Sequence, residues 1–199
     1  MRALALASLV AVATLATACS PKDDAATTDT AAATATATPT TTGAAAAPAL
    51  NDAQVAHVAV TASSIDSAAG VTAQSKARHA DVKAFARMMV QDHAGVNKQA
   101  VALATRLGVT PEDNDVSRSL QDGAKQAADG MNGLTGAAFD KAYIDREVAY
   151  HQAVLDALDQ TLVPATQNAE LKKLLQDARP NFVAHLERAK QIQSTLAAR

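Results

Sequence analysis

Apolar residues recur every three or four positions along four segments of the chain, and this spacing predicts four long amphipathic helices. The segments cover residue 51 to the late seventies, residues 81–108, about 137–162, and 168 to the C-terminal region. A shorter helix is expected over 113–131, between the second and third. No run alternates strictly between apolar and polar positions as a half-buried strand would. The pattern therefore predicts an all-α fold: an antiparallel four-helix bundle with an extra short helix in the connection between long helices 2 and 3.

Two prolines are expected to interrupt this pattern. Pro164 disfavours the helical conformation in the residue before it, so the third long helix should end at Leu162. The fourth then restarts, with Asn168 as its cap. Pro180 lies inside the fourth helix and removes one backbone hydrogen bond, which predicts a kink or a break near 177–179.

Histidine is scarce, but three of the five histidines fall on apolar stripes. His93, His151 and His185 each lie on the inward face of a different long helix, near its middle. They could therefore meet at one level of the bundle. The stripe of the first helix contains no histidine, and its members are Val55, Val58, Ala62, Ile65 and Ala69.

Buried imidazoles need partners, because an unpartnered buried polar group costs about 1–3 kcal/mol. One solution is a structural polar layer, for which Tyr143, Tyr150, Glu147, Asn97 and Asn181 are the candidate partners. The other solution is a divalent metal ion bound by His93, His151 and His185, with Glu147 one turn before His151. Such a set would suit zinc, iron or manganese, and Met89, one turn from His93, would admit copper. Both solutions remain open at this point.

The N-terminal region predicts export. Residues 1–18 have an apolar stretch that is too short to span a bilayer and suits a signal peptide. Small residues precede Cys19, the sole cysteine, as in a bacterial lipobox, which predicts lipidation of Cys19 and a membrane anchor in the outer membrane. The alternative is a plain secretory signal that leaves Cys19 as a free thiol in the periplasm. Residues 19–49 then form an Ala- and Thr-rich tether, and 50–199 form the bundle domain.

Composition narrows the function further. The chain has 18 Lys and Arg against 20 Asp and Glu, which gives no basic excess for nucleic-acid binding. One cysteine excludes an internal disulfide framework. A di-metal oxidase would need Glu-x-x-His pairs on two helices, and none occurs, so an enzyme is not expected.

Three motifs carry a family resemblance: DVKAFARMMVQDH at 81–93, FDKAYIDREVAYHQAVLDAL at 139–158 and ARPNFVAHLERAK at 178–190. They resemble the secreted bacterial family known as domain of unknown function 4142. The resemblance implies a ferritin-like bundle and an outer-membrane location, and the motif histidines match His93, His151 and His185. It implies no activity. The chain departs from the family in its first helix, which lacks a Glu-rich segment around 63–69.

Together these observations predict a non-enzymatic cell-envelope lipoprotein that faces the periplasm and binds a metal ion or small ligand within its bundle. The alternative is a structural or interaction module that docks on an envelope protein and whose polar layer is purely structural.

Overall fold

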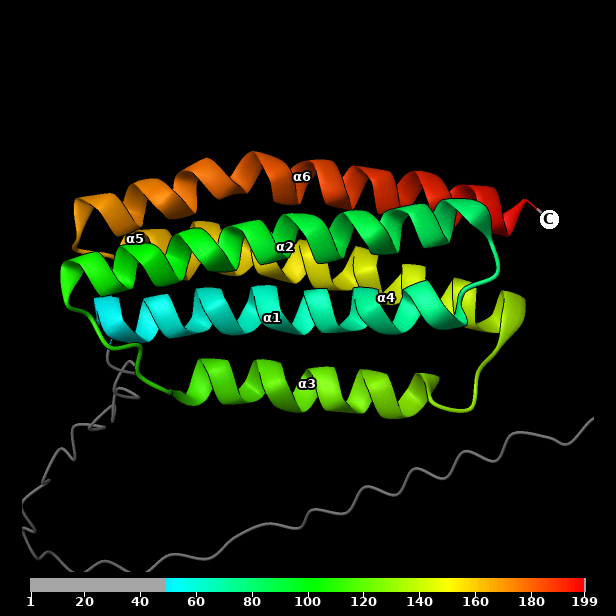
Figure 1. The fold of residues 1–199 in the computed structure, drawn as a ribbon, viewed down its shortest axis with the longest axis horizontal. Coiled ribbons are helices and arrows are strands. Elements are labelled where there is room, and N and C mark those ends of the chain that lie inside the picture. Colours follow the sequence, from blue (N-terminus) through cyan, green and yellow to red (C-terminus); the bar gives the residue numbers. More distant parts are fainter. Residues whose placement is uncertain (1–48, 199) are drawn as a thin grey trace, which may run out of the picture. The chain divides into compact units, whose positions relative to one another are not determined.

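The computed structural model describes residues 49–198, and the predicted signal peptide, Cys19 and nearly all of the tether lie outside this range. The described part contains five main helices and no strand, which confirms the all-α prediction (Figure 1). They are α1 (Asp52–Lys76), α2 (Ala80–Leu107), α3 (Asp115–Met131), α4 (Gly136–Ala157) and α6 (Ala169–Ala197). Over residues 49–198, no helix has the length and apolar character that crossing a membrane requires.

The four longest helices pack around a common core. Helix α1 contacts α2 and α4, and α6 contacts the same two helices from the other side. Following the colours of Figure 1, each of these neighbours runs antiparallel to the next. This arrangement is possible because α3 runs back along the bundle between α2 and α4.

Polar caps and one glycine set several helix ends. The Asn51 side chain accepts from the backbone N–H of Gln54, and the Gln54 side chain accepts from the N–H of Asn51, which forms a capping box. Asn168 caps α6 as predicted. Helix α2 ends at Gly108, which takes the left-handed conformation with φ 65°. Helix α2, expected from residue 81, begins at Ala80, and its cap is His79, whose ring nitrogen accepts from the N–H of Asp81.

The chain leaves the helical conformation after Ala165 rather than before Pro164, and α6 is not broken at Pro180. The helical path continues past Pro164 through a π-helical segment, η1 (Leu158–Leu162), and the short α5 (Val163–Ala165). In this wider turn the N–H of Val163 donates to the carbonyl oxygen of Leu158. The turn contains one residue more than an α-helical turn, which makes room for the ring of Pro164, a residue without an N–H to donate. Helix α6 is likewise continuous through Pro180 and is curved (Figure 1). Pro180 is exposed, so water can satisfy the carbonyl that it leaves free.

The apolar core is divided into two clusters. One fills the end of the bundle where α1 and α6 begin, and the other fills the end where α2 and α4 begin. The first includes Val55, Leu103, Leu155, Leu175 and Phe182. The second includes Phe85, Met89, Phe139, Tyr143 and Ile192. Between the clusters lies a layer of buried polar side chains.

Helices α1 and α2 approach each other closely at Gly70. A Cβ atom there would lie 2.9 Å from the carbonyl oxygen of Ala86 and 3.0 Å from a methyl carbon of Val90. Only a glycine permits this spacing, and it holds α1 against α2 one turn from the buried Asp66.

We expect Gly70→Ala to lower the free energy of unfolding by about 1–3 kcal/mol, because the added methyl group overpacks this contact. Gly95→Ala is the matched control: Gly95 lies inside α2, and a Cβ there meets no atom within 4 Å. That control should gain about 0.5–1 kcal/mol from helix propensity. Urea unfolding followed by circular dichroism measures both, and a stabilised Gly70→Ala would disprove the close contact.

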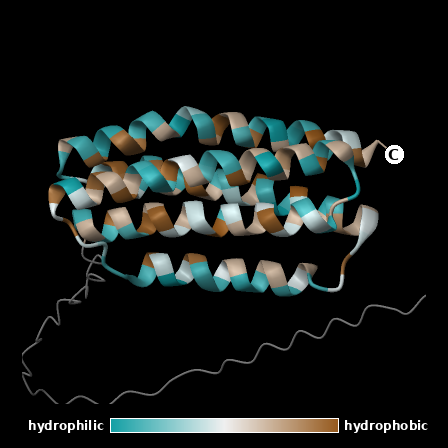
Figure 2. Cartoon of the chain, viewed as in Figure 1, coloured by the Kyte–Doolittle hydropathy of each residue, from teal (hydrophilic) through white to brown (hydrophobic). Residues whose placement is uncertain are grey.

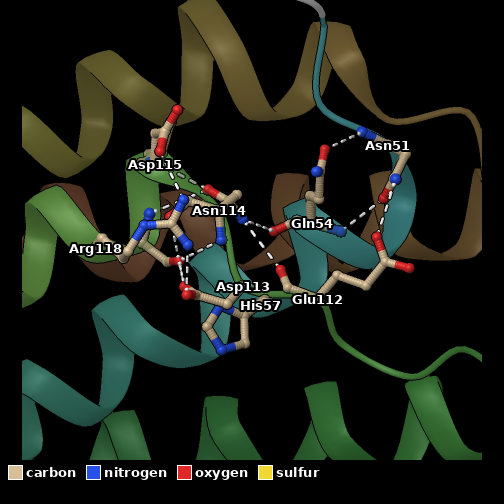
Figure 3. A network of polar contacts seen from close by, with 10 residues as sticks. Asn51, Gln54, His57, Glu112, Asp113, Asn114, Asp115 and Arg118 are labelled. Atoms are coloured by element: carbon tan, nitrogen blue, oxygen red, sulfur yellow. Dashed lines mark hydrogen bonds and ion pairs between the residues drawn. The ribbon is translucent and has the colours of Figure 1, made fainter.

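Helix α3 is attached to α1 mainly at its two ends. At its start, Asn114 donates to the carbonyl of Gln54 while its own side-chain oxygen caps the helix, and Arg118 pairs with Asp113 and Asp115 (Figure 3). At its end, Lys76 donates to the carbonyls of Met131 and Asn132. Between these attachments the helix is largely hydrophilic and buries only Ser117 (Figure 2).

Two grooves open along the interface of α3 with α1 and α4. One has a volume of about 540 Å³ and is lined by all three helices. The other, of about 290 Å³, lies between α3 and α4. Arg146 of α4 lines both grooves, so its side chain separates them from the buried polar layer.

Candidate metal centre

Each of the four long helices contributes at least one buried polar side chain with a potential ligand atom to the middle of the bundle. Four of these side chains are Asp66 of α1, His93 of α2, His151 of α4 and His185 of α6. Their exposed fractions are 0, 2, 1 and 3%. Because each occupies an inward helical position between the two apolar clusters, the four residues meet at one level.

The three histidines predicted from the stripes form one cluster. Ring centroids are 5.9 Å apart for His93 and His151, 5.4 Å for His93 and His185, and 5.3 Å for His151 and His185. One nitrogen from each ring lies within 4.8 Å of the other two. Glu147, the predicted carboxylate, is fully buried one turn before His151. The structure thus places all four predicted residues in one polar layer.

Hydrogen bonds on the outer side of this cluster fix two imidazole tautomers. His151 Nδ1 lies 3.0 Å from the backbone carbonyl oxygen of Glu147, and His185 Nε2 lies 2.9 Å from Oδ2 of Asp92. A carbonyl or carboxylate oxygen only accepts, so both of these nitrogens donate. The remaining nitrogens, His151 Nε2 and His185 Nδ1, therefore carry lone pairs, and neither has a hydrogen-bond partner among the described residues.

Asp66 adds a carboxylate oxygen to the same cluster. Its Oδ1 accepts from Arg146, whereas its Oδ2 lies 2.9 Å from His93 Nε2 and 3.5 Å from His151 Nε2. Despite the 2.9 Å separation, neither Asp66 Oδ2 nor either nitrogen of His93 is aligned for a hydrogen bond within the described chain. Each long helix therefore contributes at least one buried atom of ligand type that has no hydrogen-bond partner among the described residues, and Glu147 Oε2 and the Tyr143 hydroxyl are buried in the same way.

Arg146 balances the charge of the buried carboxyl groups. Its Nη1 donates to both Asp66 and Glu147, and its guanidinium stacks 4.2 Å from the ring centroid of Tyr150. The Tyr150 hydroxyl donates to the carbonyl of Ala62 on α1, which ties this face of α4 to α1. The guanidinium is thus held in place from both sides.

These surroundings separate the two carboxyl groups in pKa. Burial acts to raise the pKa of Asp66, but the contact with His93 and the charges of Arg146 and His151 together outweigh it and lower that pKa below its usual value of 3.8. For Glu147, burial and the neighbouring Asp66 charge outweigh Arg146 and raise the pKa well above 4.5. Asp66 is therefore the first of the pair to ionise, and its charge is the one that Arg146 compensates.

Burial also keeps two of the imidazoles neutral. It lowers the pKa of His151 to about 4, although the Asp66 charge opposes the change, and it lowers the pKa of His185. Both rings are therefore uncharged at pH 7. The neutral ring is the form that binds a metal ion.

Lowering the pH from 6.5 to 4 is expected to destabilise the metal-free protein through His151. The unfolded chain takes up this proton near pH 6.5 and the folded chain only near pH 4, so the unfolded state binds more protons in this window. At about 1.4 kcal/mol per pH unit, the loss is roughly 3 kcal/mol. The raised pKa of Glu147 has the opposite effect above pH 4.5, since it makes the folded state more stable as the pH falls. The urea titrations are therefore made on the Glu147→Gln variant, in which this effect is absent. A flat profile in that variant would contradict the shift of His151.

Asp66 is the functional candidate that the sequence pattern missed. The stripe predicted for the first helix placed Ile65 and Ala69 inward, but both are half-buried, and Asp66 and Gly70 occupy the inward positions. Asp66 and Glu147 each direct one oxygen to Arg146, but Asp66 Oδ2 lies 2.9 Å from His93 Nε2, whereas Glu147 Oε2 lies 3.5 Å from His151 Nδ1, the nitrogen that donates to the Glu147 carbonyl. The segment 63–69, where the family pattern would place glutamates, therefore does supply an acidic side chain.

Comparison with known proteins supports this fold and identifies the family. A solved structure described as "CopM in the Cu(II)-bound form" matches with a TM-score of 0.58 and 16% sequence identity, covering 74% of this chain and 99% of that chain. At this identity the match shows a shared helical fold. No curated protein matches the sequence significantly. The family model "Domain of unknown function (DUF4142)" matches residues 36–192, so the chain belongs to the DUF4142 family.

Proposed function

We propose that this protein binds one divalent transition-metal ion, Cu(II) or Zn(II), in the middle of its bundle through His93, His151, His185 and Asp66. The observation that carries this proposal is a group of buried ligand atoms that lack hydrogen-bond partners among the described residues: nitrogens of the three clustered histidines, and Asp66 Oδ2, which lies 2.9 Å from His93 Nε2 and 3.5 Å from His151 Nε2. A buried polar atom without a partner costs about 1–3 kcal/mol, so several of them in one layer destabilise the metal-free protein. A bound ion would give these ligand atoms a partner.

The donor set favours a borderline cation. Three imidazole nitrogens and one carboxylate oxygen suit Cu(II) and Zn(II), whereas thiolate and thioether ligands suit Cu(I). The Cu(II)-bound form of CopM, which shares the fold, makes copper the first ion to test. Met89, which the sequence suggested for copper, packs in the apolar cluster at the α2 N-terminal end.

Four protein ligands also support a binding role rather than catalysis. Catalytic zinc sites keep one position open for water or substrate, whereas closed sites use four protein ligands. The hydrogen bonds that His185 donates to Asp92 and His151 donates to the Glu147 carbonyl hold these two imidazoles in the ligating tautomer. We therefore propose a non-enzymatic metal-binding lipoprotein of the cell envelope, with its location resting on the signal-peptide pattern and on Cys19.

One observation favours the alternative of a structural polar layer. The Arg146 guanidinium already contacts both buried carboxyl groups and is held by Tyr150. The negative charge of the layer is therefore balanced without a second cation. In that case the protein would act as an interaction module for another envelope protein.

Metal content distinguishes the two. The full chain, produced without a polyhistidine tag, is loaded separately with Cu(II) and Zn(II), dialysed, and measured by plasma mass spectrometry. We expect about one ion per chain, lost in His151→Asn and Asp66→Asn. His57→Asn is the control, because His57 lies in the network at the start of α3 (Figure 3). A folded wild-type protein that retains less than about a tenth of an ion would favour the structural layer.

A further inference from the structure

The four candidate ligands are closed off from solvent, so an ion needs a route to them. Their exposed fractions do not exceed 3%. The apolar clusters cover the layer toward both ends of the bundle. Two of its sides carry charged side chains that reach outward: Arg146 beneath α3, and Asp92 beside α6.

The side beneath α3 is unfavourable for a cation. Arg146 lines both grooves there and stands between them and the carboxyl groups of Asp66 and Glu147. An ion that entered by this route would have to pass a fixed positive charge in a poorly solvated setting, where repulsion is strong.

The side formed by α2 and α6 has the opposite character. Asp92 of α2 has a side chain that is 41% exposed, and its Oδ2 lies 2.9 Å from Nε2 of His185 on α6. The other ring nitrogen of His185, Nδ1, is buried without a hydrogen-bond partner among the described residues, and the ring lies 5.4 Å and 5.3 Å from those of His93 and His151 between centroids. One imidazole thus connects a solvent-exposed carboxylate on its outer side with the candidate ligand atoms on its inner side.

We propose that the divalent cation reaches the buried site between α2 and α6, with Asp92 as its first contact. This inference rests on the proposed function. The carboxylate attracts the cation to this face, and movement of the His185 ring away from Asp92 opens the way inward. When the ring returns, its hydrogen bond to Asp92 again holds Nδ1 toward the cluster, so Asp92 also positions this ligand.

Two substitutions separate these roles. Asp92→Asn keeps an oxygen that can accept from His185 but removes the charge, whereas Asp92→Ala removes both. Glu187→Gln is the matched control, since it removes one negative charge from an exposed residue of α6, two positions from His185.

Stopped-flow measurement of Cu(II) or Zn(II) uptake by the full chain, at low ionic strength and with a chromogenic chelator as reporter, tests the proposal. We expect association to slow about ten-fold in Asp92→Asn and Asp92→Ala, and to change less than two-fold in Glu187→Gln. In Asp92→Ala the affinity should also fall at least about ten-fold, with an altered Cu(II) electron paramagnetic resonance spectrum, whereas Asp92→Asn should retain the wild-type spectrum.

The failures of the two proposals are distinguishable. If the wild-type protein takes up an ion and Asp92→Asn associates within two-fold of the wild-type rate, the route at Asp92 is wrong while the metal site stands. If the wild-type protein takes up neither Cu(II) nor Zn(II), the metal site itself is wrong, and the route with it.

Discussion

Arg146→Met is expected to lower the free energy of unfolding of the metal-free protein by about 3–5 kcal/mol, because it leaves the buried Asp66 carboxylate without its charge partner. Methionine retains much of the apolar volume of the arginine stem, so the loss reports mainly on the charge. The stacking on Tyr150 is also lost and contributes in the same direction.

The same substitution should have the opposite effect on metal binding. With the guanidinium absent, the positive charge beside Asp66 can come from the ion, so the stabilisation gained on adding Cu(II) or Zn(II) should exceed that of the wild type. Urea unfolding in the presence of chelator, and then of metal, measures both effects.

The control for Arg146 is Arg118→Met. Arg118 also pairs with two acidic side chains, Asp113 and Asp115, but its side chain is 53% exposed. Exposed pairs contribute little, so its loss should stay below about 1 kcal/mol. Equal losses of unfolding free energy in the two variants would show that burial of Arg146 does not increase its contribution to stability.

Removing the metal is expected to lower the unfolding temperature by about 8–16 °C. An ion held at a free concentration a thousand times its Kd adds about 4 kcal/mol to the folded state. For a domain of this size, each kcal/mol corresponds to roughly 2–4 °C. This expectation depends on the proposed function.

Calorimetry of the loaded, chelated and reloaded full chain measures the shift, and reloading should restore it. His151→Asn should give the same unfolding temperature with and without the ion, because it removes one of the ligands. If loaded and chelated wild-type protein unfold at the same temperature, the buried histidines are not ligands of a tightly bound ion.

The histidine cluster was predictable because helical periodicity alone defines an inward face. His93, His151 and His185 each replace an apolar residue in a regular stripe, so a four-helix arrangement brings them together. Local capping preferences, rather than periodicity, identify the end of α2 at Gly108 and the cap of α6 at Asn168.

Asp66, Arg146 and Asp92 were not predictable in the same way. In the first helix, a rule that places apolar side chains inward selects Ile65 and rejects Asp66, and it fails because Arg146, 80 residues away, compensates the carboxylate. A second stripe with steps of three or four runs along the first helix and would have shown this other face. It contains Val58, Ala62, Asp66, Gly70 and Ala73. Asp92 becomes significant only through its contact with His185, 93 residues away.

The prolines show a different limit. Local rules predicted that the helix would end before Pro164 and kink or break near Pro180, yet the helix extends to Ala165 and α6 is unbroken through Pro180. At Pro164 a wider turn accommodates the missing hydrogen bond, and at Pro180 the residue whose carbonyl loses its helical donor, Gln176, is exposed to solvent. The cost of each proline is therefore small enough for tertiary packing to outweigh it.

The polar layer between the two apolar clusters also determines how the helices are aligned along their axes. Seams rich in Ala, Val and Leu are nearly repetitive, so a helix shifted along its axis by one turn, about 5.4 Å, would still bury apolar side chains. Such a shift would place Asp66 or Arg146 among leucines and valines, away from their partners. The buried charges therefore act as a register mark that permits a single longitudinal alignment of α1 with α4, whether or not an ion is bound.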